Sequence, residues 1–227
     1  MDVAVIGGTG AEGFGIALRL AAVGHHVVIG SREAERGGEA GARAVEELGG
    51  HATVDGTDNA GAANAADVVF VTVPFAAQAD ICRSIKEAVR PGSIVLDATS
   101  PLATAVGGRP WQLVRPWDGS AAEQARSILG HGPRVVAGFH TIAASALQDL
   151  GRPIDSDVLL CGDDADAKHV VGGLFEQIPG LRWVDCGDLS MARVTETITA
   201  LLISVNRRYK VHDSGFRISG RETWGKP

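Results

Sequence analysis

A glycine-rich segment near the start of the chain has the residue types and spacing that a pyrophosphate-binding turn needs. An apolar run at residues 3–6 leads into Gly8, Gly10 and Gly13, and a periodic helix and a second apolar strand follow. This order favours a binding site over a turn with a structural role only. The first glycine permits a tight turn, the second lets the backbone approach a phosphate, and the third lets the helix pack closely and direct its free N–H groups at the ligand. We therefore expect dinucleotide contacts from Gly8, Thr9, Gly10, Ala11, Glu12 and Gly13.

The residues after the second strand indicate which dinucleotide is bound. Enzymes that prefer NAD usually carry Asp or Glu here, to bind the ribose hydroxyls. This chain has Ser31 and Arg32, followed one helical turn later by Arg36. A carboxylate would repel a 2′-phosphate, whereas a hydroxyl and two guanidiniums would bind it. The alternative is a pair of ordinary surface arginines, but the segment favours NADP over NAD.

Further candidate ligand-binding residues follow later strands. In an open α/β sheet the ligand lies beyond the carboxyl ends of the strands. The residues expected at that rim are Val73, Pro74, Phe75, Thr99, Ser100, His140 and Thr141. His140 could donate a hydrogen bond to an acceptor's oxygen or stabilise its developing negative charge, and the alternative is a capping residue. Phe75 could pack beside a nicotinamide ribose or in the core, and Thr99 and Ser100 could belong to an ordinary turn.

Alternating strands and helices would position these residues. After the glycine turn, helices are expected at 33–49, 59–66, 78–89 and 120–129, and strands at 52–54, 67–75, 93–97 and 134–139. This order predicts an α/β fold with a Rossmann-type, doubly wound parallel sheet. A smaller C-terminal α/β unit follows, with strands at 158–161 and 181–185 and helices at 166–177 and 189–208. We expect an NADP-binding domain over residues 1–140 and a smaller domain over 141–227.

Composition argues against several other classes of protein. Of 227 residues 45% are hydrophobic, so the chain can bury one good core, or a large one and a small one. The formal net charge of −6 argues against nucleic acid as a partner, because a phosphate backbone needs a basic surface. Three widely separated cysteines, without a CxxC pair, predict neither a disulfide framework nor a metal site. Without a signal peptide or an apolar run of membrane-spanning length, the sequence predicts a cytoplasmic enzyme.

The side chains that usually protonate a carbonyl substrate are missing from the pattern. The chain has no nucleophile elbow and no Tyr-x-x-x-Lys pair, and its single tyrosine, Tyr209, precedes Lys210 near the C-terminus. An enzyme that reduces a carbonyl usually needs a proton donor. An enzyme that moves hydride between two cofactors needs chiefly to align them. Three hypotheses stay open: such a hydride transfer, reduction of another small acceptor such as an imine or ketone by NADPH, and NADP binding without catalysis.

Five segments of the chain resemble one known family. They are Ile-Gly-Gly-Thr-Gly at 6–10, Val-Val-Ile-Gly-Ser-Arg at 27–32, Phe-His-Thr-Ile-Ala-Ala at 139–144, Cys-Gly-Asp-Asp at 161–164 and Asn-Arg-Arg-Tyr-Lys at 206–210. The family they resemble is the F420-dependent NADP oxidoreductases, and the resemblance extends over nearly the whole chain. It implies reversible hydride transfer between NADP(H) and the 5-deazaflavin coenzyme F420, with nicotinamide C4 and deazaflavin C5 stacked in an interdomain cleft.

The resemblance also implies roles for individual residues. Those that would hold NADP are Thr9, Ser31, Arg32 and Arg36. Those that would lie near the two reacting rings are Pro74, Phe75, His140 and Thr141. The chain departs from the family at Arg36, where a lysine is common, at Glu12 in the glycine turn, and in a C-terminal extension, Arg221–Pro227, whose role stays open.

The last expected helix, 189–208, has more apolar residues than one narrow stripe requires. They are Met191, Val194, Ile198, Leu201, Leu202, Ile203 and Val205. A surface helix of a small domain normally has a broader polar face. A two-fold contact with a second copy would cover the excess, so we expect a homodimer. The alternative is that the sheet and tail of the same chain cover this helix.

Overall fold

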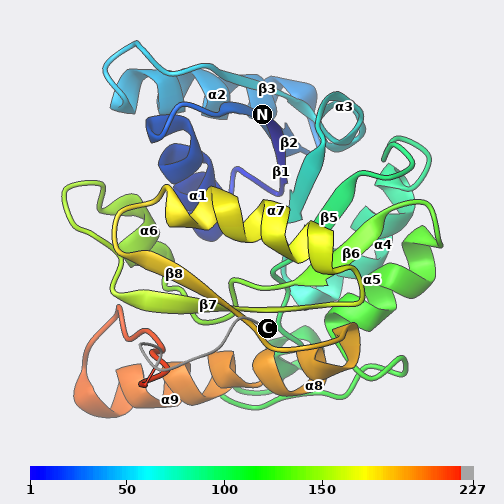
Figure 1. Cartoon of the computed structure of the whole chain (residues 1–227), viewed down its shortest axis with the longest axis vertical. Coiled ribbons are helices and arrows are strands. Elements are labelled where there is room, and N and C mark those ends of the chain that lie inside the picture. The colour runs from blue at the N-terminus through cyan, green and yellow to red at the C-terminus, as the bar shows by residue number, and fades with distance from the viewer. Residues whose placement is uncertain (221–227) are drawn as a thin grey trace.

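The computed structural model describes residues 1–220. Within them, strand β1 (Asp2–Ile6) lies inside a sheet of eight strands (Figure 1). The other strands are β2 (His26–Ser31), β3 (Val54–Asp58), β4 (Val68–Val71), β5 (Ile94–Asp97), β6 (Arg134–Ala137), β7 (Ser156–Gly162) and β8 (Leu181–Asp185). Their order is β3-β2-β1-β4-β5-β6-β7-β8. Strands β1 to β6 are parallel, β7 is antiparallel to β6, and β8 is parallel to β7.

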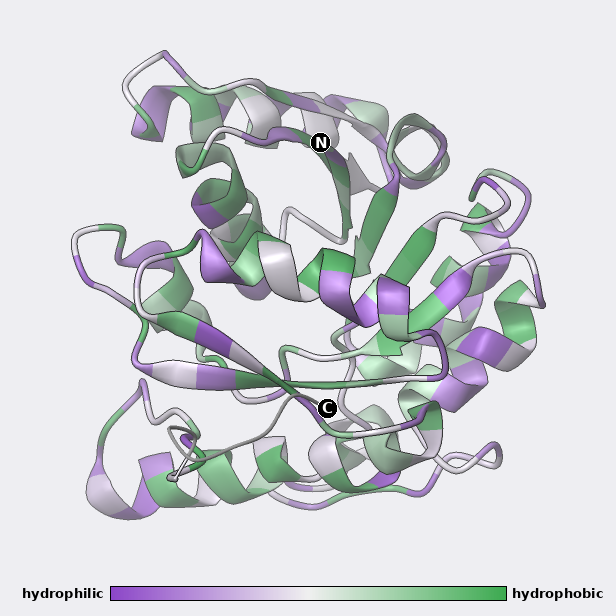
Figure 2. Cartoon of the chain, viewed as in Figure 1, coloured by the Kyte–Doolittle hydropathy of each residue, from purple (hydrophilic) through white to green (hydrophobic). Residues whose placement is uncertain are grey.

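Helices cover both faces of this sheet. They are α1 (Ala11–Ala22), α2 (Ala34–Glu47), α3 (Asn59–Ala65), α4 (Phe75–Ile85), α5 (Ala121–Leu129), α6 (Ala144–Gln148), α7 (Ala165–Glu176), α8 (Ala192–Thr195) and α9 (Ile198–Tyr209), with 3-10 helices η1 (Ala103–Val106) and η2 (Leu189–Met191). One core joins α1, α2 and α7 to the sheet, and a second core joins α3, α4 and α5 to the other face. The strands between these cores are strongly hydrophobic (Figure 2). The expected Rossmann-type, doubly wound sheet is therefore confirmed.

None of the helices within residues 1–220 combines the length and apolarity needed to span a membrane.

The C-terminal α/β unit shares the sheet of the N-terminal unit. Strand β7 pairs directly with β6, so the hydrogen-bonded sheet continues past residue 140. The assignment of separate roles to 1–140 and 141–227 stays a prediction. The extension Arg221–Pro227 lies outside the described residues.

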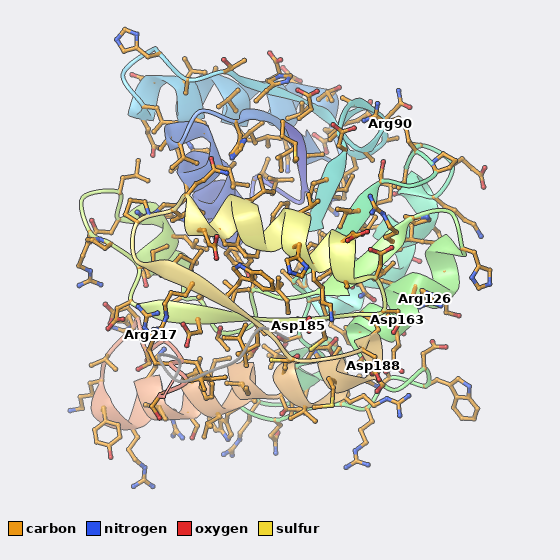
Figure 3. All side chains as sticks on the ribbon, in the orientation of Figure 1. Arg90, Arg126, Asp163, Asp185, Asp188 and Arg217 are labelled. Atoms are coloured by element: carbon orange, nitrogen blue, oxygen red, sulfur yellow. The ribbon has the colours of Figure 1, made fainter. Side chains whose placement is uncertain are left out.

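The Cys-Gly-Asp-Asp segment connects three helices to the end of β7. Asp163 pairs with Arg126 of α5, and its other oxygen accepts the N–H of Leu189 at 3.1 Å (Figure 3). Asp164 caps α7 by accepting the N–H of Ala167 at 2.8 Å. These contacts are structural, so this part of the family resemblance comes from the fold and not from the candidate site.

A buried arginine holds the segment after β6 against α1. Arg19 is only 3% exposed, and its Nε donates to the carbonyl of Leu147 at 2.8 Å. Its Nη2 donates to the carbonyls of Ala146 at 2.8 Å and Arg152 at 2.9 Å, and also to that of Asp149. One guanidinium thus satisfies carbonyl groups around the end of α6 that no helix bond could reach.

The expected continuous helix over residues 189–208 is wrong, because the structure divides it into η2, α8 and α9. The last two helices are separated at Glu196 and Thr197. The buried carboxylate of Glu196 accepts the N–H groups of Ala121 at 2.9 Å and Ala122 at 3.0 Å. Glu196 therefore caps the start of α5, and α9 begins only after this contact.

Candidate active site

The glycine turn joins β1 to α1 as expected, with its tightest point one residue earlier. Gly7 has φ +76°, a conformation that favours glycine, whereas the sequence pattern assigned the tight turn to Gly8. A Cβ on Gly13 would lie 2.4 Å from Oγ1 of Thr72, so the expected close packing of α1 is present. Gly10 precedes α1, and no side chain within residues 1–220 caps that helix start. Its first N–H groups are therefore available to phosphate oxygens.

A cavity of about 490 Å³ lies beside this turn, at the end of β2. Its lining includes Thr9, Ser31, Arg32 and Arg36, which the sequence predicted together. Ser31 is buried, while both guanidiniums are exposed and Nε of Arg36 lies 3.1 Å from a carboxylate oxygen of Glu33. Two cations and a hydroxyl against one carboxylate leave a net positive charge, which fits a 2′-phosphate.

Asn59 is a lining residue of this cavity that the sequence analysis missed. It begins α3, is 7% exposed, and its Oδ1 is buried without a hydrogen-bond partner among the described residues. A buried, unpaired acceptor is costly unless a ligand satisfies it. No local sequence pattern marks this residue, because α3 approaches the cavity only when β3 is paired beside β2.

A second cleft, of about 460 Å³, adjoins the first and shares Gly10, Thr72, Val73, Pro74 and Ala76 with it. Its other lining residues are Ala11, Glu12, Phe75, Ala98, Thr99, Ser100, Leu102, Thr104, Ala105, Phe139, His140, Ile142 and Thr199. The structure therefore brings together residues from the ends of β1, β4, β5 and β6, as the position of ligands in open α/β sheets predicts. A dinucleotide that extends from one cavity into the other would pass Gly10 and Pro74.

His140 lies in the second cleft as an uncharged imidazole. It is 6% exposed, and neither ring nitrogen has a hydrogen-bond partner among residues 1–220. Burial lowers the pKa of His140 to about 4, and a weaker opposing effect of the Thr99 backbone does not reverse this. The preceding residue, Phe139, has φ +73°, which turns the chain sharply at the end of β6. Its ring packs edge-on against Phe70 and Phe175, so core contacts compensate for that strained backbone.

Thr199 of α9 connects His140 to the turn that carries Ser100. Oγ1 of Thr199 donates to the carbonyl of His140 at 2.7 Å and lies 2.6 Å from Oγ of Ser100. Because a threonine hydroxyl has one proton, Ser100 must donate in the second contact. Thr199 was not predicted as a site residue, because its side chain reaches the cleft from a helix whose apolar pattern indicates only packing.

Asp97 supports the turn that carries Thr99 and Ser100, two residues that line the second cleft. It is fully buried at the end of β5, accepts the N–H of Thr99 at 2.8 Å, and also accepts a hydrogen bond from the amide of Gln78. Burial raises the pKa of Asp97 to about 6, although both hydrogen bonds favour its charged form. The backbone contact fixes the turn from which Thr99 and Ser100 face the cleft.

Glu12 belongs to the second cleft and not to the cavity at the phosphate end. It lines the cleft that contains His140 and is absent from the lining of the cavity around Arg32. Burial raises the pKa of Glu12 to about 8, with a smaller contribution from the charge of Asp97. A phosphate would therefore not meet this carboxyl as a repelling anion.

Three predicted site residues lie outside both cavities, as the described residues define them. Gly8 and Gly13 shape the turn without lining a cavity. Thr141 is 2% exposed, and its Oγ1 donates to the carbonyl of Asp157 at 2.8 Å. It borders a different cavity, next to Ile154. The structure thus separates Thr141 from the cleft that its neighbour His140 lines. No group of three or more His, Cys, Asp or Glu side chains within residues 1–220 is arranged for a metal ion.

Comparison with known proteins decides the family of this chain. Residues 2–101 match the family described as NADP oxidoreductase coenzyme F420-dependent. The F420-dependent NADP reductase of Methanothermobacter thermautotrophicus is 44% identical over 221 residues, which are 96% of this chain and 95% of that protein. The chain belongs to the F420-dependent NADP reductases.

Other members of the F420-dependent NADP reductases match over a similar length. The protein of that name from Methanocaldococcus jannaschii is 42% identical over 225 residues, or 98% of this chain and 100% of that one. A crystal structure of a candidate F420-dependent NADP reductase from Arthrobacter sp. FB24 has a TM-score of 0.81 at 27% identity, covering 96% of this chain and 99% of the other. The family expected from the five sequence segments is confirmed.

Proposed function

We propose that this chain transfers hydride reversibly between NADP(H) and the deazaflavin coenzyme F420. Its membership of the F420-dependent NADP reductases supports this activity. The observation that carries the proposal is the cleft of about 460 Å³ that extends from the glycine turn to His140. It adjoins a basic cavity suited to the 2′-phosphate, so the nicotinamide end of NADP would lie in the cleft with room for a second ring system.

The residues that would hold NADP divide between the two cavities. At the phosphate end we assign Ser31, Arg32 and Arg36 to the 2′-phosphate, and the turn around Thr9 and Gly10 to the pyrophosphate. The residues assigned to the nicotinamide half are Ala11, Glu12, Val73, Pro74, Phe75, Thr99 and Ser100. Gly8 and Gly13 act through the shape of the turn.

The chemistry requires alignment more than covalent participation. Dihydronicotinamide supplies the hydride and the deazaflavin accepts it, so the protein must hold the two rings together and exclude water. We assign His140 to the deazaflavin, where its neutral imidazole can donate one hydrogen bond from a fixed position. Thr199 fixes the backbone of His140, and Thr141 positions the same segment through its bond to Asp157. Thr141 is therefore a positioning residue.

Following the absorbance of oxidised F420 after mixing with NADPH tests this function. We expect deazaflavin absorbance to fall, and to recover when F420H2 is mixed with NADP+. Turnover of imines or ketones without any reaction of F420 would favour the second hypothesis from the sequence. Tight NADPH binding without turnover of any acceptor would favour a protein that binds NADP without catalysis.

We also propose that the enzyme works as a homodimer in the cytoplasm. Apolar side chains on and before α9 are exposed in the single chain, among them Leu201 at 59%, Val194 at 54% and Met191 at 40%. A second copy would cover them.

The three cysteines are free thiols, in keeping with a reducing compartment. In this scheme 1–140 binds NADP, and 141–227 contributes Thr199 to the F420 cleft and α9 to the dimer. The net charge of −6 argues against nucleic acid as a further partner.

A further inference from the structure

Glu12 places a carboxyl in the cleft where the two rings would meet. It belongs to the first turn of α1 and lines this cleft together with His140 and Thr99. Its carboxyl makes no hydrogen bond or ion pair with any residue in 1–220. An unpaired acid at a hydride-transfer site has no structural contact that would explain it.

The surroundings of Glu12 keep its carboxyl protonated. Among the described residues that line the cleft there is no lysine or arginine, and His140 is uncharged. Asp97 approaches from the end of β5, and its negative charge adds to the effect of burial, so the pKa of Glu12 rises to about 8. The N-terminal end of α1 acts in the opposite direction and favours an anion. The carboxyl therefore stays neutral near pH 7 but can ionise when a cation arrives.

Hydride transfer brings such a cation into the cleft. The dihydronicotinamide ring of NADPH is neutral, whereas the oxidised nicotinamide ring of NADP+ carries a positive charge. A positive charge close to a carboxyl lowers its pKa. The reduced deazaflavin at the same time needs one proton besides the hydride.

We propose that Glu12 holds the proton that accompanies the hydride, and this proposal rests on the function proposed above. The C4–H bond of NADPH breaks, and its hydrogen leaves with both electrons to form a C–H bond on the deazaflavin. Glu12 loses its proton, which the reduced deazaflavin takes up, and the carboxylate that remains pairs with the cationic nicotinamide. NADPH, F420 and protonated Glu12 thus give NADP+, F420H2 and ionised Glu12, which water reprotonates once NADP+ leaves.

Proton release on binding tests this assignment without any turnover. In weakly buffered solution at pH 7 with an indicator dye, NADP+ and NADPH are each added to the protein in the absence of F420. The two nucleotides share the same 2′-phosphate, so the difference in proton release between them reports the effect of the nicotinamide charge. We expect NADP+ binding to release nearly one proton more than NADPH binding in the wild type, and Glu12→Gln to abolish the difference.

Glu196→Gln is the matched control. The pKa of Glu196 is also raised to about 8 by burial, but this residue caps α5 and does not line the cleft. The proton difference should persist in this variant. An equal proton release for both nucleotides in the wild type, or a difference that survives Glu12→Gln or disappears in Glu196→Gln, would overturn the proposal.

The pH dependence of affinity provides a second readout that needs only the wild type. The ratio of NADP+ affinity to NADPH affinity should rise about tenfold from pH 6 to pH 8, because the ionised form of Glu12 favours the cation. A flat ratio would contradict the assignment. Both measurements are independent of F420. A protein that shows them but fails to reduce F420 would disprove the proposed function, and only the coupling of Glu12 ionisation to the nicotinamide charge would stand.

Discussion

The guanidinium of Arg32 borders the same cavity as Ser31 and Arg36. The 2′-phosphate is the part of NADPH that NADH lacks, and a hydrogen bond to a charged group contributes about 1.5–3 kcal/mol. We expect Arg32→Ala to raise the Michaelis constant for NADPH about ten- to hundredfold while leaving that for NADH nearly unchanged. Steady-state kinetics with both nucleotides measure the difference.

Arg83→Ala is the control for Arg32→Ala. Arg83 is also an exposed arginine, paired with Asp80 on α4, and lines neither cavity. Its removal should change neither Michaelis constant. An equal loss with NADPH and NADH in Arg32→Ala would mean that Arg32 supports the fold and not the phosphate.

The role assigned to His140 is assistance by a neutral side chain. His140→Ala should lower turnover about ten- to hundredfold, the low end for lost electrostatic assistance, with NADPH affinity barely altered. Since burial lowers the pKa of His140 to about 4, wild-type turnover should not lose this contribution as pH falls through 6.5, the ordinary value for histidine. Turnover and a fluorescence titration with NADPH measure both effects. Activity below detection in a folded variant that still binds NADPH would show that His140 is an essential proton donor.

Residues that follow the end of a strand could be predicted from sequence, and residues that reach the site from elsewhere could not. Ser31, Arg32 and His140 each come directly after an apolar run, so a parallel sheet places them at one edge. Thr199 lies 59 residues from His140 and belongs to a helix with an apolar stripe. For Glu12 the glycine pattern indicated the position in the turn but not the cleft that this residue lines.

At the scale of elements, α1 and the segment after β6 are held together by one side chain. Arg19 donates to four backbone carbonyls in residues 146–152. Of these four bonds only the one to Leu147 is fully buried; a buried carbonyl left without a partner costs about 1–3 kcal/mol, whereas water can reach the part-buried ones. We expect Arg19→Met to lower the free energy of unfolding by about 3 kcal/mol, measured by denaturant titration. Arg83→Ala should cost less than about 1 kcal/mol, since its ion pair is exposed. Equal small losses in the two variants would contradict the role of Arg19.

Periodicity predicted the buried elements well and the boundary elements less well. Strand β8 occupies the expected residues 181–185, and α7 differs from expectation by one residue at each end. Strand β3 was expected at 52–54 but runs over Val54–Asp58, because an edge strand that pairs only with β2 can include polar residues and glycine. The division of 189–208 depends on Glu196 reaching Ala121, 75 residues away, which no local pattern could indicate.

At the scale of the whole molecule, α9 lies at the periphery and carries many apolar residues (Figures 1 and 2). Among them Leu201 is 59% exposed. Only Ala200 of this helix is buried. We expect light scattering at micromolar protein to give twice the chain mass of 23.5 kDa, and Leu201→Glu to lower it toward that value. Ser84→Glu places the same charge on an exposed position of α4 and should leave the mass unchanged. A wild-type mass near 23.5 kDa would rule out the dimer.

In the proposed reaction, hydride passes directly between two rings in the cleft beside His140. The most direct measurement uses NADPH deuterated at both C4 positions, with oxidised F420 in ordinary water and mass spectrometry of the product. We predict one deuterium in each molecule of F420H2, carried on carbon and therefore retained after exchange in water. F420H2 formed without deuterium, or no F420H2 at all, would contradict direct hydride transfer from NADPH to F420.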